Sequence, residues 1–123
     1  SYEDIRTVLE HIEKQYEAGD TIYVYAGAAS GFRYYQTRFS FPEDRIIWGS
    51  SARRSWDNYL ADIDRIKDAG RTSWLVFSHV GVTAADMDEA RFLLHFLDTV
   101  GERQDTVQAK KASGYLYRFP AGQ

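Results

Sequence analysis

Three short loops of the sequence combine glycine, serine, arginine and histidine in patterns that suit anion binding. Each loop follows a run of apolar and β-branched residues, which predicts a buried strand. The loops cover residues 27–33, 49–55 and 78–79. Ligands of open α/β sheets bind beyond the carboxyl ends of the strands, so we expect the three loops to meet at one edge.

The residues expected to line this edge carry hydrogen-bond donors or leave room for a ligand beside the backbone. They are Tyr25, Gly27, Ser30, Arg33, Tyr34, Ser50, Arg53, Arg54 and His79. Guanidinium groups bind anions through paired N–H donors, so Arg53 and Arg54 make the second loop the best candidate anion site. The alternative for the first loop is a tight strand-to-helix turn, and for the second a solvated loop without a ligand.

The sequence predicts no catalytic side chain together with a second side chain that could activate it. His79 is the one candidate base at this edge, and Ser78 beside it would point to the opposite face of a strand. The sequence contains no cysteine, and His11 and His95 fall on separate predicted helices. We therefore assign no catalytic residue, no metal site and no cofactor.

Two groups of acidic residues are interpreted as surface features. Asp57, Asp62 and Asp64 fall among the polar positions of a predicted helix, which indicates a solvated face. Asp86, Asp88 and Glu89 fall near the start of another helix, where acidic side chains stabilise the helix dipole. Neither group predicts a pair of carboxylates facing each other across a cleft.

Alternating helix and strand patterns must position these loops. Helical spacing covers 5–16, 32–39, 56–69 and 84–100, and strand-like runs cover 21–26, 45–48, 72–80, 106–109 and 115–119. Lys110 to Gly114 are expected to form the turn of a terminal hairpin. The order predicts a single α/β domain over residues 1–123, a three-layer α/β/α sandwich with a mostly parallel Rossmann-like sheet and a C-terminal antiparallel hairpin.

The composition is that of a globular domain and disfavours a nucleic-acid partner. Hydrophobic residues make up 44% and charged residues 27% of the 123 residues, as in ordinary globular domains. The net charge of -3 gives no general attraction to phosphate backbones, so a nucleic-acid partner is not expected. The chain contains no apolar run near the roughly 20 residues that span a bilayer.

Four segments of the sequence resemble a known family. They are residues 19–28, 32–35, 74–80 and 114–117. Together they are similar to the C-terminal soluble domain of multi-spanning bacterial membrane proteins that are glycosyltransferase-like, of the protein mannosyltransferase and aminoarabinose transferase superfamily. The resemblance implies a position on the extracytoplasmic (periplasmic) side of the inner membrane and the membrane portion of the same parent chain as partner. It also implies a parent enzyme that uses a polyprenyl-phosphate sugar donor, with its catalytic residues outside this chain.

These observations lead to one expectation and two alternatives. We expect an accessory domain that binds an acceptor or regulates the parent enzyme, with an anionic or glycan ligand and without catalysis of its own. One alternative is a free-standing α/β enzyme that binds a small molecule or anion at the carboxyl edge. The other is a protein interaction module.

Overall fold

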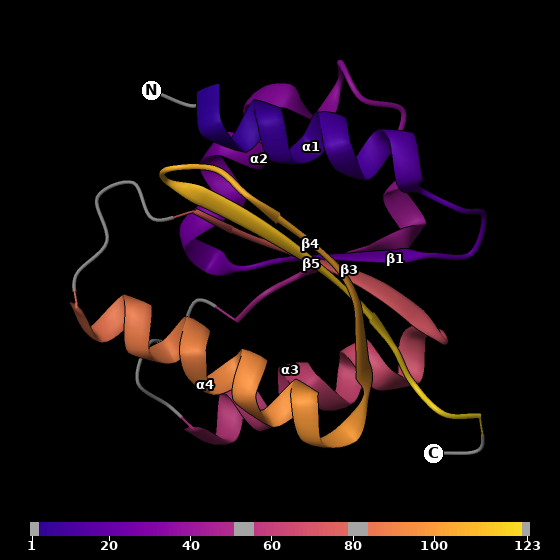
Figure 1. The fold of residues 1–123 in the computed structure, drawn as a ribbon, viewed down its shortest axis with the longest axis vertical. Coiled ribbons are helices and arrows are strands. Elements are labelled where there is room, and N and C mark those ends of the chain that lie inside the picture. The colour runs from indigo at the N-terminus through magenta and orange to yellow at the C-terminus, as the bar shows by residue number, and fades with distance from the viewer. Residues whose placement is uncertain (1–2, 51–55, 79–83, 122–123) are drawn as a thin grey trace.

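A computed structural model of the chain describes residues 3–50, 56–78 and 84–121. In this part of the chain a five-stranded sheet lies between two pairs of helices (Figure 1). The helices are α1 (Glu3–Gln15), α2 (Ala29–Gln36), α3 (Trp56–Ala69) and α4 (Ala84–Val100). The strands are β1 (Thr21–Val24), β2 (Ile46–Trp48), β3 (Thr72–Ser78), β4 (Glu102–Gln108) and β5 (Ala112–Arg118). Two short 3₁₀ turns, η1 (Ala26–Ala28) and η2 (Glu43–Arg45), precede α2 and β2.

The sheet is mixed, with the strand order β2-β1-β3-β5-β4. β1 pairs in parallel with β2 and β3, whereas β5 pairs antiparallel with both β3 and β4. The expected α/β class and the terminal hairpin are present, but the sheet is not mostly parallel. The reason is that β5 turns back from β4 and pairs along the whole of β3, from Thr72 to Ser78.

Strand alternation divides the buried residues into two cores. Ile22 and Val24 of β1 face α1 and α2, whereas Tyr23 between them faces α3 and α4. β3 is buried on both faces, with Trp74 on the α1 side and Leu75 on the α3 side. Each fully buried side chain of this size contributes about 1.5–3 kcal/mol. The two cores therefore hold one helix pair on each side of the sheet (Figure 1).

The helix before β2 and the terminal hairpin differ from their predicted bounds. The helix predicted at 32–39 begins earlier, at Ala29, because it continues directly from η1. The hairpin strands are longer than predicted, and the turn is closed by the Ala109 N–H donating to the Ala112 carbonyl at 2.9 Å. Gly114 thus lies inside β5 rather than in the turn. A Cβ on Gly114 would come within 2.9 Å of both Val107 and Val8, so glycine lets α1 pack closely on the sheet.

Within the described residues, no helix combines the length and the apolar character that crossing a membrane requires.

Candidate functional site

The carboxyl ends of β1, β2 and β3 meet at one edge, where the predicted loops begin. The Gly49 N–H donates to the Val24 carbonyl at 2.8 Å, and the Tyr25 N–H donates to the Val76 carbonyl at 3.0 Å. The first bond joins the residue directly after β2 to the end of β1. The second joins the residue before η1 to β3. Among the predicted ligand residues, Arg53, Arg54 and His79 lie outside the described residues.

A buried carboxylate on α3 holds the residues that follow β2. Asp62 is 2% exposed and accepts hydrogen bonds from the Tyr23 hydroxyl at 2.7 Å and from the Ser50 backbone N–H at 2.8 Å. Arg65 adds an ion pair to the other carboxylate oxygen at 3.1 Å. Ser50, predicted to bind ligand, thus meets Asp62 through its backbone N–H. Asp62 lies in the core, so its predicted place on a solvated helix face is wrong.

The position of the Tyr23 hydroxyl explains why residue 49 is glycine, and its burial beside Asp62 explains why the hydroxyl stays protonated. A Cβ on Gly49 would lie 2.6 Å from the Tyr23 hydroxyl oxygen and 2.9 Å from the Val24 carbonyl oxygen, so no side chain fits there. Burial, reinforced by the negative charge of Asp62, raises the pKa of the Tyr23 hydroxyl far above its ordinary value near 10.0. Tyr23 is therefore a hydrogen-bond donor to Asp62 at every physiological pH.

A second buried carboxylate binds Tyr25, the residue directly after β1. The Tyr25 hydroxyl donates to Glu89 of α4 at 2.6 Å, and the two residues are 4% and 3% exposed. Gly27, in η1, faces the Tyr25 ring, because a Cβ there would lie 3.4 Å from it. Glu89 was expected to stabilise the helix dipole at the surface, but it is buried. Its spacing from Leu93 and Leu97, four and eight residues later, could have placed it on the apolar stripe of α4.

Three predicted ligand residues lie on α2 and are exposed. Ser30 and Arg33 are accessible, and Tyr34 is 64% exposed, with its ring perpendicular to that of Tyr35. The Arg33 guanidinium lies 4.4 Å from the centre of the Trp48 ring, a distance at which the ring face attracts the cation. Among the described residues, no carboxylate forms an ion pair with Arg33.

The structure therefore divides the predicted residues between the two faces of the sheet. Trp48, whose ring lies beneath the Arg33 guanidinium, packs with the α1 and α2 core. Tyr25 belongs to the α3 and α4 core. The described carboxylates Asp62 and Glu89 are already bonded to tyrosine hydroxyls, an arrangement that ties helices to strands. No group of three metal-ligating side chains occurs in the part of the chain that the structure describes. Of the predicted residues that are described, Arg33 is best placed to meet an anion.

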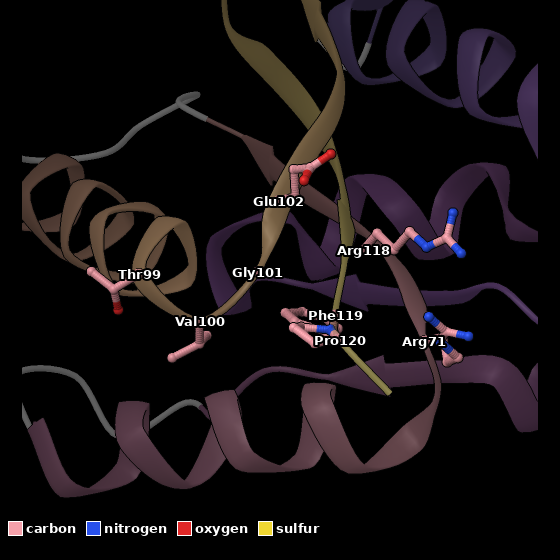
Figure 2. Close-up of a pocket in the computed structure, with 8 residues that line it drawn as sticks. All are labelled: Arg71, Thr99, Val100, Gly101, Glu102, Arg118, Phe119 and Pro120. Atoms are coloured by element: carbon pink, nitrogen blue, oxygen red, sulfur yellow. The ribbon is translucent and has the colours of Figure 1, made fainter. Parts of the chain in front are cut away.

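The opposite edge of the sheet carries a cavity of about 410 Å³, which no pattern in the sequence predicted. Its lining includes Arg71 and Arg118, whose side chains extend away from Thr99 and Val100 at the end of α4 (Figure 2). The carboxyl ends of α3 and α4 lie at this edge, and helix carboxyl ends attract cations. Arg45 has such a role at the end of α3, because its guanidinium donates to the Ala69 carbonyl at 3.0 Å.

Comparison with protein families, with curated proteins and with solved structures gives no match to this chain.

Proposed function

We propose that the chain is an extracytoplasmic accessory domain of a bacterial membrane glycosyltransferase-like protein and has no catalysis of its own. The resemblance of four segments to such domains suggests the family. The observation that carries the non-catalytic role is the use of buried polar groups at the carboxyl edge. Asp62 and Glu89 accept hydrogen bonds from Tyr23 and Tyr25, so both carboxylates serve the packing of helices on the sheet.

The proposed partner is the membrane portion of the same parent chain, on the periplasmic side of the inner membrane. Exposed apolar side chains on α3 support a contact surface of this kind. Trp56 is 52% and Leu60 38% exposed, one helical turn apart, and the Trp56 ring centre lies 4.3 Å from that of Phe92 on α4. Exposed apolar side chains that form a contiguous patch are typical of contact sites, and the contact of Trp56 with the half-buried Phe92 joins apolar groups of α3 and α4.

The proposed ligand is an anionic or glycan group that approaches Arg33. The exposed guanidinium is oriented by the Trp48 ring, and an oriented guanidinium loses less freedom when it binds. We also propose that the fold is a Rossmann-like variant, because β2, β1 and β3 are parallel and joined through helices on both faces. In this variant β5 and β4 extend the sheet with antiparallel strands.

The first test is the hydropathy of the reading frame that encodes this chain. We expect several membrane spans in the same frame. A frame without any would refute the accessory role and direct the search to an enzyme formed by this chain alone.

The second test uses the complete parent protein in membranes. Sugar transfer from a polyprenyl-phosphate sugar is measured for Arg33→Ala and for the control Arg38→Ala, another exposed arginine of this region that lies over the Tyr35 ring. We expect Arg33→Ala to raise the KM for the acceptor several-fold and to leave kcat unchanged, because Arg33 would contribute binding only. Turnover by the 123-residue chain without its membrane portion would contradict the proposal.

A further inference from the structure

Another cavity, of about 330 Å³, opens between α4 and the β4–β5 hairpin. Its lining residues come from β3, α4, β4 and β5, and are Phe77, Ala90, Arg91, Leu94, Gln108, Ser113 and Tyr115. The volume falls at the small end of the range of about 300–1,000 Å³ that is typical of small-molecule sites. The cavity is large enough for one six-membered ring with its substituents.

The lining of the cavity combines apolar side chains with uncharged hydrogen-bonding groups. Phe77, Ala90 and Leu94 are its hydrocarbon members. Within the same lining the Gln108 side-chain amide donates to the Tyr115 hydroxyl oxygen at 3.0 Å. This bond leaves the hydroxyl proton of Tyr115 and the amide oxygen of Gln108 with no other partner in the described part of the chain. A donor and an acceptor side by side match a ligand hydroxyl group, which both accepts and donates.

The walls of this cavity are held in place by the buried tyrosine network. The Phe77 ring lies between the rings of Tyr25 and Tyr115, with centre distances of 5.3 Å and 5.9 Å. Tyr25 is bonded to Glu89, the residue directly before Ala90. A site whose walls are fixed in advance loses little conformational entropy when a ligand binds.

The charge of the lining argues against a strongly anionic ligand. Among the described residues that line the cavity, Arg91 is the one charged residue, and it is exposed at the surface of α4. A phosphate group would need several charged or backbone donors converging on it, and the paired amide and hydroxyl do not supply them.

We propose that this cavity binds a single uncharged sugar ring. A pyranose has the required combination of an apolar ring face and an edge of hydroxyl groups. Sugar binding in this cavity would be independent of the accessory role proposed above.

The binding test is an NMR titration of the full chain labelled with ¹⁵N. The probes are methyl α-D-glucopyranoside, methyl α-D-mannopyranoside and N-acetylglucosamine, with inorganic phosphate as the charged comparison. We expect at least one sugar to shift the amide signals of Leu94, Gln108 and Ser113 with a Kd on the order of millimolar. Absence of shifts there with all three sugars, well above that concentration, would overturn the proposal, as would tighter binding of phosphate at these residues.

Two variants locate the site. Ala90→Leu places a larger side chain in the cavity and should abolish the shifts, while Tyr115→Phe keeps the ring, removes the hydroxyl and should weaken binding about three- to tenfold. The amide spectrum shows directly whether each variant is folded. Arg71→Gln, in the cavity at the opposite edge, is the matched control and should bind as the wild type does. Equal loss in the control, or none in Tyr115→Phe and Ala90→Leu when both are folded, would contradict the assignment.

Discussion

The two faces of the sheet are packed with different kinds of side chain. On the α1 and α2 side, the strands contribute aliphatic residues and Trp74 to a core completed mainly by aliphatic and phenylalanine side chains. On the α3 and α4 side, Leu75 and Phe77 of β3 are joined by tyrosines from β1, from the residue directly after it and from β5, whose hydroxyls are bonded to carboxylates. The pairs are Tyr23 with Asp62, Tyr25 with Glu89 and Tyr117 with Asp98.

The difference shows two ways of attaching helices to one sheet. Burial of apolar surface is non-directional, so it holds α1 and α2 without specifying particular partners. A hydrogen bond between a tyrosine and a carboxylate is directional, and each one joins a particular residue in or directly after a strand to a particular helix residue. Desolvation of the carboxylates opposes this gain. These three pairs, called here the tyrosine face, therefore attach α3 to β1, and α4 to β5 and to the residue after β1.

The largest expected effect of a single substitution is at Asp62. Asp62→Ala should lower the free energy of unfolding by about 3–5 kcal/mol, because it leaves the Tyr23 hydroxyl buried without its acceptor. Asp64→Ala, two residues away on the exposed face of α3, is the control and should change stability by less than about 0.5 kcal/mol. Urea unfolding of the two variants measures both values. Equal values would mean that Asp62 has no role in attaching α3.

On the opposite face, α1 packs closely on β5 at Gly114 without hydrogen bonds between side chains. This contact can be compared with the hydrogen-bonded contact of α3 at Asp62. Gly114→Ala places a methyl group 2.9 Å from Val8 and Val107, and we expect a loss of about 1–3 kcal/mol from overpacking. The loss should be the same at neutral and alkaline pH, because no titratable group is involved. Unchanged or increased stability in urea unfolding would show that α1 can shift outward at no cost.

Alkaline pH should weaken the tyrosine face. Burial and the neighbouring carboxylates raise the pKa of Tyr23 and of Tyr117 above the ordinary value of 10.0. The stability that these groups contribute is complete below pH 10 and declines above it, because the unfolded chain then loses protons that the folded chain retains. The decline approaches about 1.4 kcal/mol per pH unit for each such tyrosine. Unfolding measured from pH 8 to 11 should show a shallower decline for Tyr23→Phe than for the wild type, and an identical decline would contradict the assignment.

The smallest expected loss of stability comes from removing one tyrosine hydroxyl, and it is compared between a tyrosine of each face. Tyr25→Phe removes the bond to Glu89 and should cost about 1–2 kcal/mol. Tyr35→Phe, in the α1 and α2 core, should change stability by less than about 0.5 kcal/mol, because no hydrogen bond of its hydroxyl occurs among the described residues. Thermal unfolding of both variants provides the test. A larger loss for Tyr35→Phe would reverse the comparison.

Much of the fold could be predicted because its strongest patterns are local. The helices α1 and α3 and the strand β3 follow from apolar spacing and strand-forming residues, and their bounds differ little from the predicted ones. The sheet order could not be read in this way, because the pairing of β5 with β3 joins residues distant in sequence. β4 was predicted too short because Glu102 to Asp105 are polar and occupy an edge strand, where burial imposes little alternation.

The candidate site was harder to predict than the fold. The sequence indicates that the predicted loops begin at one edge of the sheet, but it does not show that Tyr25 turns its hydroxyl inward to Glu89. Asp62 was interpreted from its charge alone, although it lies three residues after Tyr59 and four before Ile66, on the buried stripe of α3. Residue type outweighed spacing in that interpretation. A charged residue within an apolar stripe is better interpreted as the partner of another buried polar group.

The most direct test of the tyrosine face is a double-mutant cycle between Tyr23 and Asp62. Unfolding free energies are measured for the wild type, Tyr23→Phe, Asp62→Ala and the double variant. If the hydroxyl and the carboxylate depend on each other, the double variant should be more stable than the sum of the two single losses indicates, by about 1.5–3 kcal/mol. Losses that simply add would show that the two groups act independently, and would contradict the conclusion that this buried bond attaches α3 to the sheet.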